Sequence, residues 1–196
     1  MKRIFDIISS GLGLIALSPL FAILAIWIKA DSKGPVFYRQ IRVGKDNTDF
    51  KLFKFRSMRP DSDKKGLITV GGHDPRVTRS GYYIRKYKLD ELPQLINVFI
   101  GDMSLVGPRP EVRKYVDMYT PQQLKVLSVR PGITSLASIR YRNENEILAQ
   151  ADNPDKCYIE KVMPDKLAID LEYVDKANLW NDIKLIFSTF REIITK

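Results

Sequence analysis

The feature that most constrains the fold of this chain is an almost wholly apolar run from Ile4 to Ile28, in which Asp6 is the only charged residue. A helix that crosses a bilayer needs about 20 apolar residues, so this run is long enough to enter a membrane. Ser18 and Pro19 fall in its middle, and a proline removes a backbone hydrogen bond and bends a helix. We therefore predict an N-terminal membrane helix with a break at Ser18-Pro19.

The charges that flank this run favour a helix that returns to the side from which it entered. Cations lie at both of its ends: Lys2, Arg3, Lys29 and Lys33. Positively charged flanks prefer the cytoplasmic side of a membrane, and a bent helix can place both of them there. We therefore predict a re-entrant membrane helix over residues 1–33, followed by a second domain over residues 34–196.

Two alternatives to a re-entrant helix remain open. The first is a plain helix that crosses the membrane once. The second is a signal peptide, in which Lys2 and Arg3 form the basic end and Ala16-Leu17-Ser18 resembles a small-residue cleavage site. Against the signal peptide, the apolar run resumes directly after Pro19.

The composition limits the partners and the chemistry of the chain. A formal net charge of +9 predicts an acidic partner, such as nucleic acid, an anionic membrane lipid or a phosphorylated substrate. No nucleic-acid-binding module is visible, so we predict no nucleic-acid partner. Cys157 and His73 are the single cysteine and histidine, which excludes an intrachain disulfide and argues against a zinc site.

A β-hairpin is predicted after the apolar run. Val36 to Val43 and Phe50 to Arg56 are rich in β-branched and aromatic residues, and turn-like residues separate them. The strand period of two places Lys54 and Arg56 on the face opposite to the aromatic residues, where they are either solvated or directed at a phosphate. Asp61 to Pro75 is polar and is predicted to be a surface loop. The predicted fold class is α/β, mostly helical with a small β-hairpin.

Two adjacent carboxylates, Asp90 and Glu91, lie just after a basic segment that contains Arg85. Pro93 follows them, and a proline is tolerated in the first turn of a helix, so we predict a helix that begins near Asp90. The unpaired N–H groups at such a position attract an anion. Taken alone, the pattern fits either a phosphate-directed pair of carboxylates or an N-capping Asp on an ordinary surface helix.

Stiff turns carry further arginines. Arg109 lies between Pro108 and Pro110, and this setting suits bidentate recognition of a phosphate. Arg130 lies in a second turn of this kind, and Arg142 follows shortly after it.

Together these motifs resemble those of the bacterial sugar transferase family, the small monotopic phosphoglycosyl transferases that use polyprenyl phosphate. The resemblance covers nearly the whole chain and rests on five segments in order: the apolar run with Ser18-Pro19, residues 54–58 (KFRSM), 89–94 (LDELPQ), 101–110 (GDMSLVGPRP) and 129–134 (VRPGIT). The segment from Asn143 to Lys166 is longer than in the smallest members of the family.

The resemblance implies that residues 34–196 form a compact cytoplasmic catalytic domain. It also implies transfer of a sugar phosphate from a UDP-sugar to undecaprenyl phosphate, with release of UMP and a requirement for Mg²⁺, on the cytoplasmic face of the bacterial inner membrane. Asp90 would be the nucleophile that forms a covalent phosphosugar intermediate, and Glu91 would help to hold Mg²⁺. The predicted substrate contacts are Lys54, Arg56, Arg85, Arg109, Arg130 and Arg142.

The resemblance leaves open which sugar and which glycan pathway are served, whether capsule, O-antigen or glycoprotein glycan. It also leaves open the oligomeric state, a homodimer included. The alternative function is a non-catalytic membrane-associated homologue or scaffold, against which the intact Asp90-Glu91 pair argues.

Overall fold

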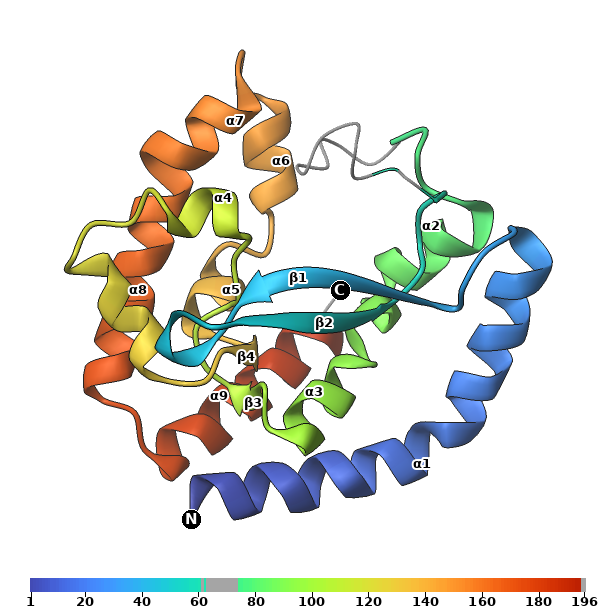
Figure 1. Ribbon diagram of the computed structural model, residues 1–196, viewed down its shortest axis with the longest axis horizontal. Coiled ribbons are helices and arrows are strands. Elements are labelled where there is room, and N and C mark those ends of the chain that lie inside the picture. Colours follow the sequence, from blue (N-terminus) through green and yellow to red (C-terminus); the bar gives the residue numbers. More distant parts are fainter. Residues whose placement is uncertain (61, 63–73, 195–196) are drawn as a thin grey trace.

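A two-stranded antiparallel hairpin runs across the middle of the molecule in the computed structural model, which describes residues 1–60, 62 and 74–194 (Figure 1). Its strands are β1 (Phe37–Val43) and β2 (Asp49–Phe55), and the register pairs Phe37 with Phe55 and Val43 with Asp49. The short turn η1 (Lys45–Asn47) joins them. The predicted hairpin is confirmed, and its strand boundaries differ from the prediction by a single residue at three ends. Most of the predicted surface loop from Asp61 to Pro75 lies outside the described residues.

The N-terminal apolar run forms one long helix, α1 (Lys2–Asp31), which changes direction part of the way along its length (Figure 1). Pro19 lies inside this helix and has no N–H to donate to the carbonyl of Ile15. The Ser18 hydroxyl donates to that carbonyl oxygen instead, at 2.8 Å. The predicted break at Ser18-Pro19 is therefore a bend in a continuous helix, and Ser18 supplies the missing hydrogen bond.

Most of the apolar side chains of α1 are uncovered, although the helix lies against the rest of the chain. By length and composition α1 is able to cross a membrane. Its buried residues are Asp6, Ser10, Leu24 and Ile28. Its large exposed apolar side chains are Ile4, Ile7, Ile8, Leu12, Ile15, Ile23, Ile26 and Trp27, and Met1, just before the helix, is exposed as well.

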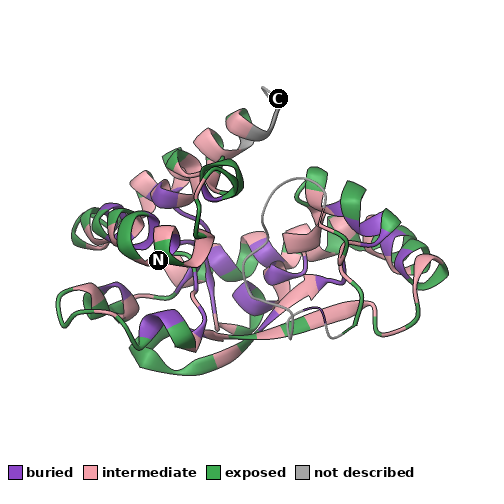
Figure 2. Cartoon of the chain, turned by 90° about the horizontal axis from the view of Figure 1, so that it is seen from above, coloured by how far each residue is buried: buried purple, intermediate pink, exposed green. Residues whose placement is uncertain are grey.

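The remaining helices pack around the hairpin and around a second, parallel pair of short strands. That pair, β3 with β4, was not predicted from the sequence. The elements in chain order are α2 (Arg79–Lys86), η3 (Leu89–Glu91), α3 (Gln94–Ile100), β3 (Ser104–Val106), α4 (Arg113–Val116), η4 (Gln123–Ser128), β4 (Gly132–Thr134), α5 (Leu136–Arg140), α6 (Glu144–Ala149), α7 (Pro154–Cys157), η5 (Tyr158–Val162), α8 (Met163–Asp175) and α9 (Leu179–Ile194). Buried residues concentrate where these elements meet (Figure 2).

The first turn of α1 is bonded to the globular part of the chain. Lys2 Nζ donates to the Val106 carbonyl at 2.9 Å and to the Tyr173 hydroxyl at 3.1 Å, and it forms an ion pair with Asp182. Arg3 donates to carbonyls at the end of α3, at 2.5 and 2.9 Å.

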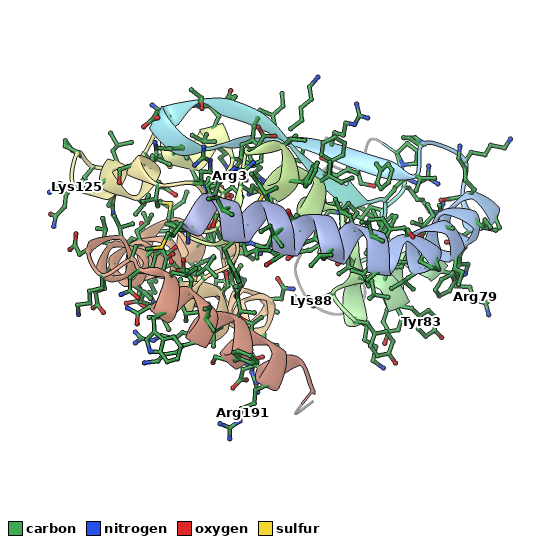
Figure 3. The ribbon with its side chains drawn as sticks, turned by 90° about the horizontal axis from the view of Figure 1, so that it is seen from below. Arg3, Arg79, Tyr83, Lys88, Lys125 and Arg191 are labelled. Carbon is green, nitrogen blue, oxygen red and sulfur yellow. The ribbon has the colours of Figure 1, made fainter. Side chains whose placement is uncertain are left out.

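The last turn of α1 is bonded to the same part of the chain. The Asp31 carboxylate accepts from the backbone N–H and the hydroxyl of Ser80, at 2.9 and 2.7 Å. The guanidinium of Arg56 donates to the carbonyls of Ser32 and Lys33, at 2.6 and 2.9 Å. In Figure 3, the label of Arg3 marks the first attachment, and the label of Arg79, which belongs to α2 and lies near the end of α1, marks the second. Both ends of the apolar helix are therefore held by one globular body.

Candidate active site

The two adjacent carboxylates lie in η3, a single 3₁₀ turn between α2 and α3. Lys88 precedes this turn with a left-handed backbone (φ 56°), which reverses the chain after α2. Pro93 is the N-cap of α3. The predicted helix start near Asp90 is therefore right to within a few residues, and the carboxylates occupy the turn before the helix rather than its first residues.

Glu91 is held by two cations that come from different parts of the chain. Lys54 Nζ, from β2, donates to Glu91 Oε1 at 3.0 Å. The Arg109 guanidinium forms a bidentate contact, with Nη2 at 2.5 Å from Oε1 and Nη1 at 3.3 Å from Oε2. Burial opposes ionisation of Glu91, but Arg109 and Lys54 outweigh it and hold the pKa of this carboxyl well below its usual range. Glu91 is therefore an ionised, fixed anchor for both cations.

Asp90 differs from its neighbour because no described residue binds its carboxylate. Within the part of the chain that the structure describes, no hydrogen bond or ion pair joins Asp90 to another side chain or to the backbone. Burial raises the pKa of Asp90; the charges of Lys54 and Arg85 oppose this rise, and that of Glu91 adds to it. The pKa values of these two adjacent carboxyls are thus shifted in opposite directions. Such a pair is typical of sites where one group reacts and the other holds neighbouring groups in position.

The turn that carries Arg109 is fixed by the parallel pairing of β3 with β4. Gly107 N–H donates to the Thr134 carbonyl at 3.0 Å, and Gly132 N–H donates to the Pro108 carbonyl at 2.9 Å. A Cβ atom on Gly132 would lie 2.1 Å from the backbone nitrogen of Gly107, so this approach requires glycine. Arg109 extends from the turn to Glu91, and 37% of its side chain stays exposed for a ligand.

The structure brings three of the six predicted substrate contacts close to the carboxylates. Lys54 and Arg109 bind Glu91 directly. Arg85 lies in the last turn of α2, near enough for its charge to lower the pKa of Asp90.

The other three predicted contacts make different interactions. Arg56 is buried, and its guanidinium holds carbonyls at the end of α1, so in this structure it anchors that helix. The Nε atom of Arg130 donates to the Gly101 carbonyl at 2.8 Å. Arg142 forms an ion pair with Glu192 of α9. None of these three arginines contacts Asp90 or Glu91 through a described interaction.

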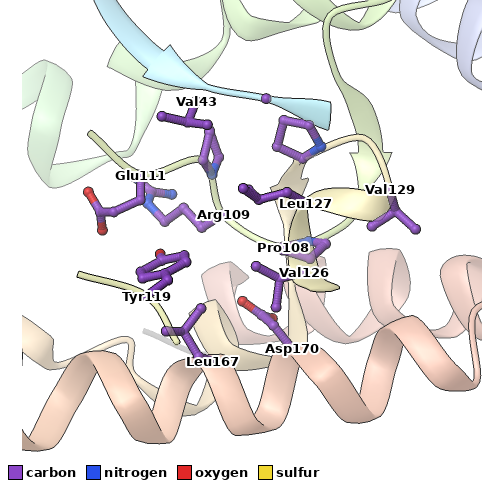
Figure 4. Close-up of a pocket in the computed structure, with 13 residues that line it drawn as sticks. Val43, Pro108, Arg109, Glu111, Tyr119, Val126, Leu127, Val129, Leu167 and Asp170 are labelled. Atoms are coloured by element: carbon purple, nitrogen blue, oxygen red, sulfur yellow. The ribbon is translucent and has the colours of Figure 1, made fainter. Parts of the chain in front are cut away.

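Sequence reasoning missed a buried carboxylate beneath the Arg109 turn. Asp170 of α8 is 4% exposed and points into a small cavity of about 20 Å³ that Arg109 also lines (Figure 4). Burial raises the pKa of Asp170 to about 6, although Lys166, the Ser135 hydroxyl and the backbone N–H groups of Ala137 and Arg109 lower it. The one sequence signal for its burial was its position three residues after Leu167, which places Asp170 on the same, apolar face of a helix.

Asp170→Asn is expected to stabilise the protein at high pH. The folded-state pKa of about 6 exceeds the ordinary 3.8, so the wild type loses stability as pH rises from about 4 through 6. The loss is about 3 kcal/mol above pH 7, and Asn removes it. Thermal unfolding should therefore show a higher Tm for Asp170→Asn at pH 8 and a smaller difference at pH 5.

Asp175→Asn, at an exposed carboxylate that ends the same helix, serves as the control and should leave Tm unchanged at both pH values. A lower Tm for Asp170→Asn at every pH would contradict this account, because it would mean that the site needs an ionised acceptor.

The donor set at η3 fits Mg²⁺ that arrives with a diphosphate. Among the residues that the structure describes, no group of three or more His, Cys, Asp or Glu side chains forms a metal site on its own. Mg²⁺ in proteins commonly keeps several waters and binds one or two carboxylates together with substrate phosphates. Asp90 and Glu91 provide two such carboxylates. The contacts with Lys54 and Arg109 use three of the roughly four acceptor positions of Glu91, which leaves one free.

Comparison with known proteins gives close relatives that act on one class of substrate. The chain is 40% identical over 198 residues to UDP-N-acetylgalactosamine-undecaprenyl-phosphate N-acetylgalactosaminephosphotransferase of Aeromonas hydrophila, covering 100% of this chain and 44% of that protein. It is 37% identical over 205 residues to UDP-glucose:undecaprenyl-phosphate glucose-1-phosphate transferase of Escherichia coli K12, covering 100% of this chain and 41% of that protein.

The chain thus spans less than half the length of these two relatives. The exopolysaccharide production protein PSS of Rhizobium leguminosarum is nearer in size: it is 38% identical over 203 residues, which cover 100% of this chain and 96% of that protein. The model of the bacterial sugar transferase family matches residues 1–196. Because this match extends over the whole sequence, the chain belongs to the bacterial sugar transferase family.

Proposed function

We propose that this chain is a phosphoglycosyl transferase, which moves a sugar 1-phosphate from a UDP-sugar to undecaprenyl phosphate and releases UMP. The observation that carries the proposal is the contrast between the two adjacent carboxylates: Glu91 is held by Lys54 and Arg109, whereas Asp90 has no hydrogen bond or ion pair among the described residues. The names of the relatives from Aeromonas hydrophila and Escherichia coli describe transfer to undecaprenyl phosphate, which supports the substrate class.

In the first step, an Asp90 carboxylate oxygen attacks the phosphorus that bears the sugar. A new P–O bond forms to Asp90, the P–O bond to UMP breaks, and UMP leaves with the electron pair. Attack by a carboxylate on a diphosphate brings negative charges together, and nearby cations offset this cost. Arg109 and Lys54 are positioned for that role by Glu91, and Arg85 adds its charge on the side of Asp90.

In the second step, an oxygen of undecaprenyl phosphate attacks the same phosphorus. The P–O bond to Asp90 breaks, which restores the carboxylate and yields undecaprenyl-diphosphate-sugar. Two displacements allow a soluble nucleotide and a membrane lipid to use one site in turn. Glu91 would hold Mg²⁺ next to Asp90, and the bound ion would supply Lewis-acid neutralisation of the diphosphate charge.

A panel of UDP-sugars tests this reaction class. The full chain in detergent or bilayer should release UMP with at least one UDP-sugar in the presence of undecaprenyl phosphate and Mg²⁺, and chelation of the metal should stop the release. The sugar that supports release identifies the donor. An absence of UMP with every donor, from protein shown to be folded, would contradict the proposal.

A re-entrant topology on the cytoplasmic face of the inner membrane accompanies this function. It is supported by the attachment of both ends of α1 to one globular body, through Lys2 at the start and Asp31 at the end. Each arm of α1 beside Pro19 is at most about 26 Å long at 1.5 Å per residue, which is shorter than a hydrocarbon core of roughly 30 Å. The exposed apolar side chains of the arms would contact lipid within one leaflet, with the site at the level of the acceptor phosphate.

Cysteine labelling tests the topology. In a Cys157→Ser background, one cysteine is placed on a short tag ahead of the exposed Met1 and another replaces the exposed Lys33. The side chain of Lys33 is free to change because Arg56 bonds only its carbonyl. We expect a membrane-impermeant maleimide to label neither position in intact cells and both after lysis. Labelling of one position in intact cells would establish a single span.

A further inference from the structure

The segment from Asn143 to Lys166 forms a helical layer beside the turn that carries Arg109. It contains α6, α7 and η5, and α7, η5 and α8 follow one another without a gap (Figure 1). We propose that Tyr158, the first residue of η5, is a positioning residue that holds Arg109 in place through Glu111. This inference rests on the proposed function for its consequence in catalysis, but its structural part is independent of that function.

The contact between Tyr158 and the turn runs through the carboxylate of Glu111. The Tyr158 hydroxyl donates to Glu111 Oε2. The opposite oxygen, Oε1, accepts from the backbone N–H of Val112 at 2.8 Å and from Arg42 Nη1 at 2.9 Å. Arg42 Nη1 also lies 3.0 Å from the carbonyl oxygen of Pro110. The carboxylate of Glu111 therefore joins β1, η5 and the Arg109 turn at one point.

The backbone positions of Glu111 and Arg109 are closely coupled because the segment between them is short and stiff. One residue, Pro110, separates them, and its ring fixes φ. On the other side, the backbone of Glu111 is tied to the hairpin, since Val43 N–H donates to the Glu111 carbonyl at 2.9 Å. The contact between Tyr158 and Glu111 therefore adds to the bonds that hold the backbone of the Arg109 turn, and with it the bidentate contact to Glu91.

The local geometry of η5 directs Tyr158 toward Glu111. Tyr158–Val162 is a π-helical segment, in which one extra residue widens the turn, and such segments are frequent at functional sites. Tyr158 and Val162 are 5% and 2% exposed. Each residue of a regular helix advances by about 100°, so a helix without the extra residue would rotate Tyr158 away from Glu111.

The phenol of Tyr158 stays a hydrogen-bond donor at every working pH. Burial, together with the charge of Glu111, raises the pKa of Tyr158 far above its ordinary value. The ammonium group of Lys166 lies 5.6 Å from the centre of the Tyr158 ring. The hydrogen bond from Tyr158 to Glu111 therefore has a structural role and is not a pH switch.

Tyr115 provides a matched control in the same core. Its ring centre lies 4.9 Å from that of Tyr158, and it is 3% exposed. Its hydroxyl also donates to a carboxylate, that of Asp155 at 2.7 Å. Asp155 belongs to α7 and has no described contact with the Arg109 turn. Tyr158→Phe and Tyr115→Phe each delete one partly buried phenol–carboxylate hydrogen bond, but only the first deletes a contact to Glu111.

The first test measures the position of Arg109 without turnover. The full chain is treated with phenylglyoxal, and modification of Arg109 is followed by peptide mass spectrometry. Loss of the Tyr158–Glu111 hydrogen bond should weaken the Arg109–Glu91 contact, so Tyr158→Phe should raise the rate of Arg109 modification several-fold. Tyr115→Phe should show the wild-type rate at a similar Tm. Equal rates in the two variants would overturn the proposal, whether or not the chain releases UMP.

The second test is a double-mutant cycle on UMP release. Tyr158→Phe should lower kcat/KM for the UDP-sugar about tenfold in the wild-type background, and Tyr115→Phe should not. In an Arg109→Ala background, Tyr158→Phe should cause no further loss, because the residue that it positions is gone. Additive losses would show that Tyr158 supports only general stability. A wild type that releases no UMP would instead contradict the proposed function and leave the labelling test to decide the inference.

Discussion

Asp90→Asn is expected to reduce UMP release by a factor of about 10⁴ or more, because the amide has no charge with which to attack phosphorus. The stability of the folded protein should not fall. Asp90 makes no described hydrogen bond, and burial disfavours its charge, so the neutral Asn should leave Tm equal or higher. Initial rates of UMP release and thermal unfolding of the same preparations check both parts.

Glu91→Gln provides the contrast to this variant. Gln is neutral and cannot form an ion pair with Lys54 or Arg109, which would then lie close together without an anion between them. We expect it to lower Tm as well as turnover and to weaken the dependence on Mg²⁺. If Asp90→Asn were the variant with the lower Tm and residual activity, the roles of the two carboxylates would be reversed.

Arg109→Ala should lower kcat/KM for the UDP-sugar by roughly 10² to 10³, because it removes a charge-assisted contact worth a few kcal/mol to the diphosphate. It also leaves Glu91 with Lys54 as its one described cationic partner. Arg109→Lys should recover only part of the loss, since an ammonium group cannot form the bidentate contact. Steady-state kinetics of the three proteins give the comparison.

Arg130→Ala is the matched control for this prediction. Arg130 is an exposed arginine next to a proline, but it donates to the Gly101 carbonyl and has no described contact with Glu91. Its removal should leave kcat/KM within about twofold of the wild type. Equal losses for Arg109→Ala and Arg130→Ala would show that the cluster at Glu91 has no special part in catalysis.

The sequence predicted those elements whose signal is local. The apolar run, the alternation in the hairpin and Pro93 next to the carboxylates each lie within a short window, and α1, the hairpin and the turn at Asp90 follow them. The strands β3 and β4 contain three residues each, too few to show a period of two. Their pairing, which positions Arg109, was therefore not visible.

The remaining differences between the predicted and the observed site arise because the basic side chains bind acceptors from distant segments of the chain. Alternation placed Lys54 and Arg56 on one strand face, but it could not show that Lys54 meets Glu91 while Arg56 reaches back to the end of α1. Neither could any local pattern show that Arg142 pairs with Glu192 near the C-terminal end of the chain. A basic residue in a motif indicates a charge, and only the tertiary structure shows which acceptor receives it.

The central claim is that Asp90 forms a covalent bond to the phosphosugar, and rapid-quench mass spectrometry without undecaprenyl phosphate tests it most directly. Wild-type protein mixed with its UDP-sugar and Mg²⁺ should release up to about one equivalent of UMP per chain, because the first displacement needs no lipid. The peptide that contains Asp90 should gain the mass of a sugar phosphate, and Asp90→Asn should give neither signal. The contradicting result is protein that turns over when undecaprenyl phosphate is present, yet shows no adduct and no UMP in its absence, since the lipid phosphate would then attack the UDP-sugar directly.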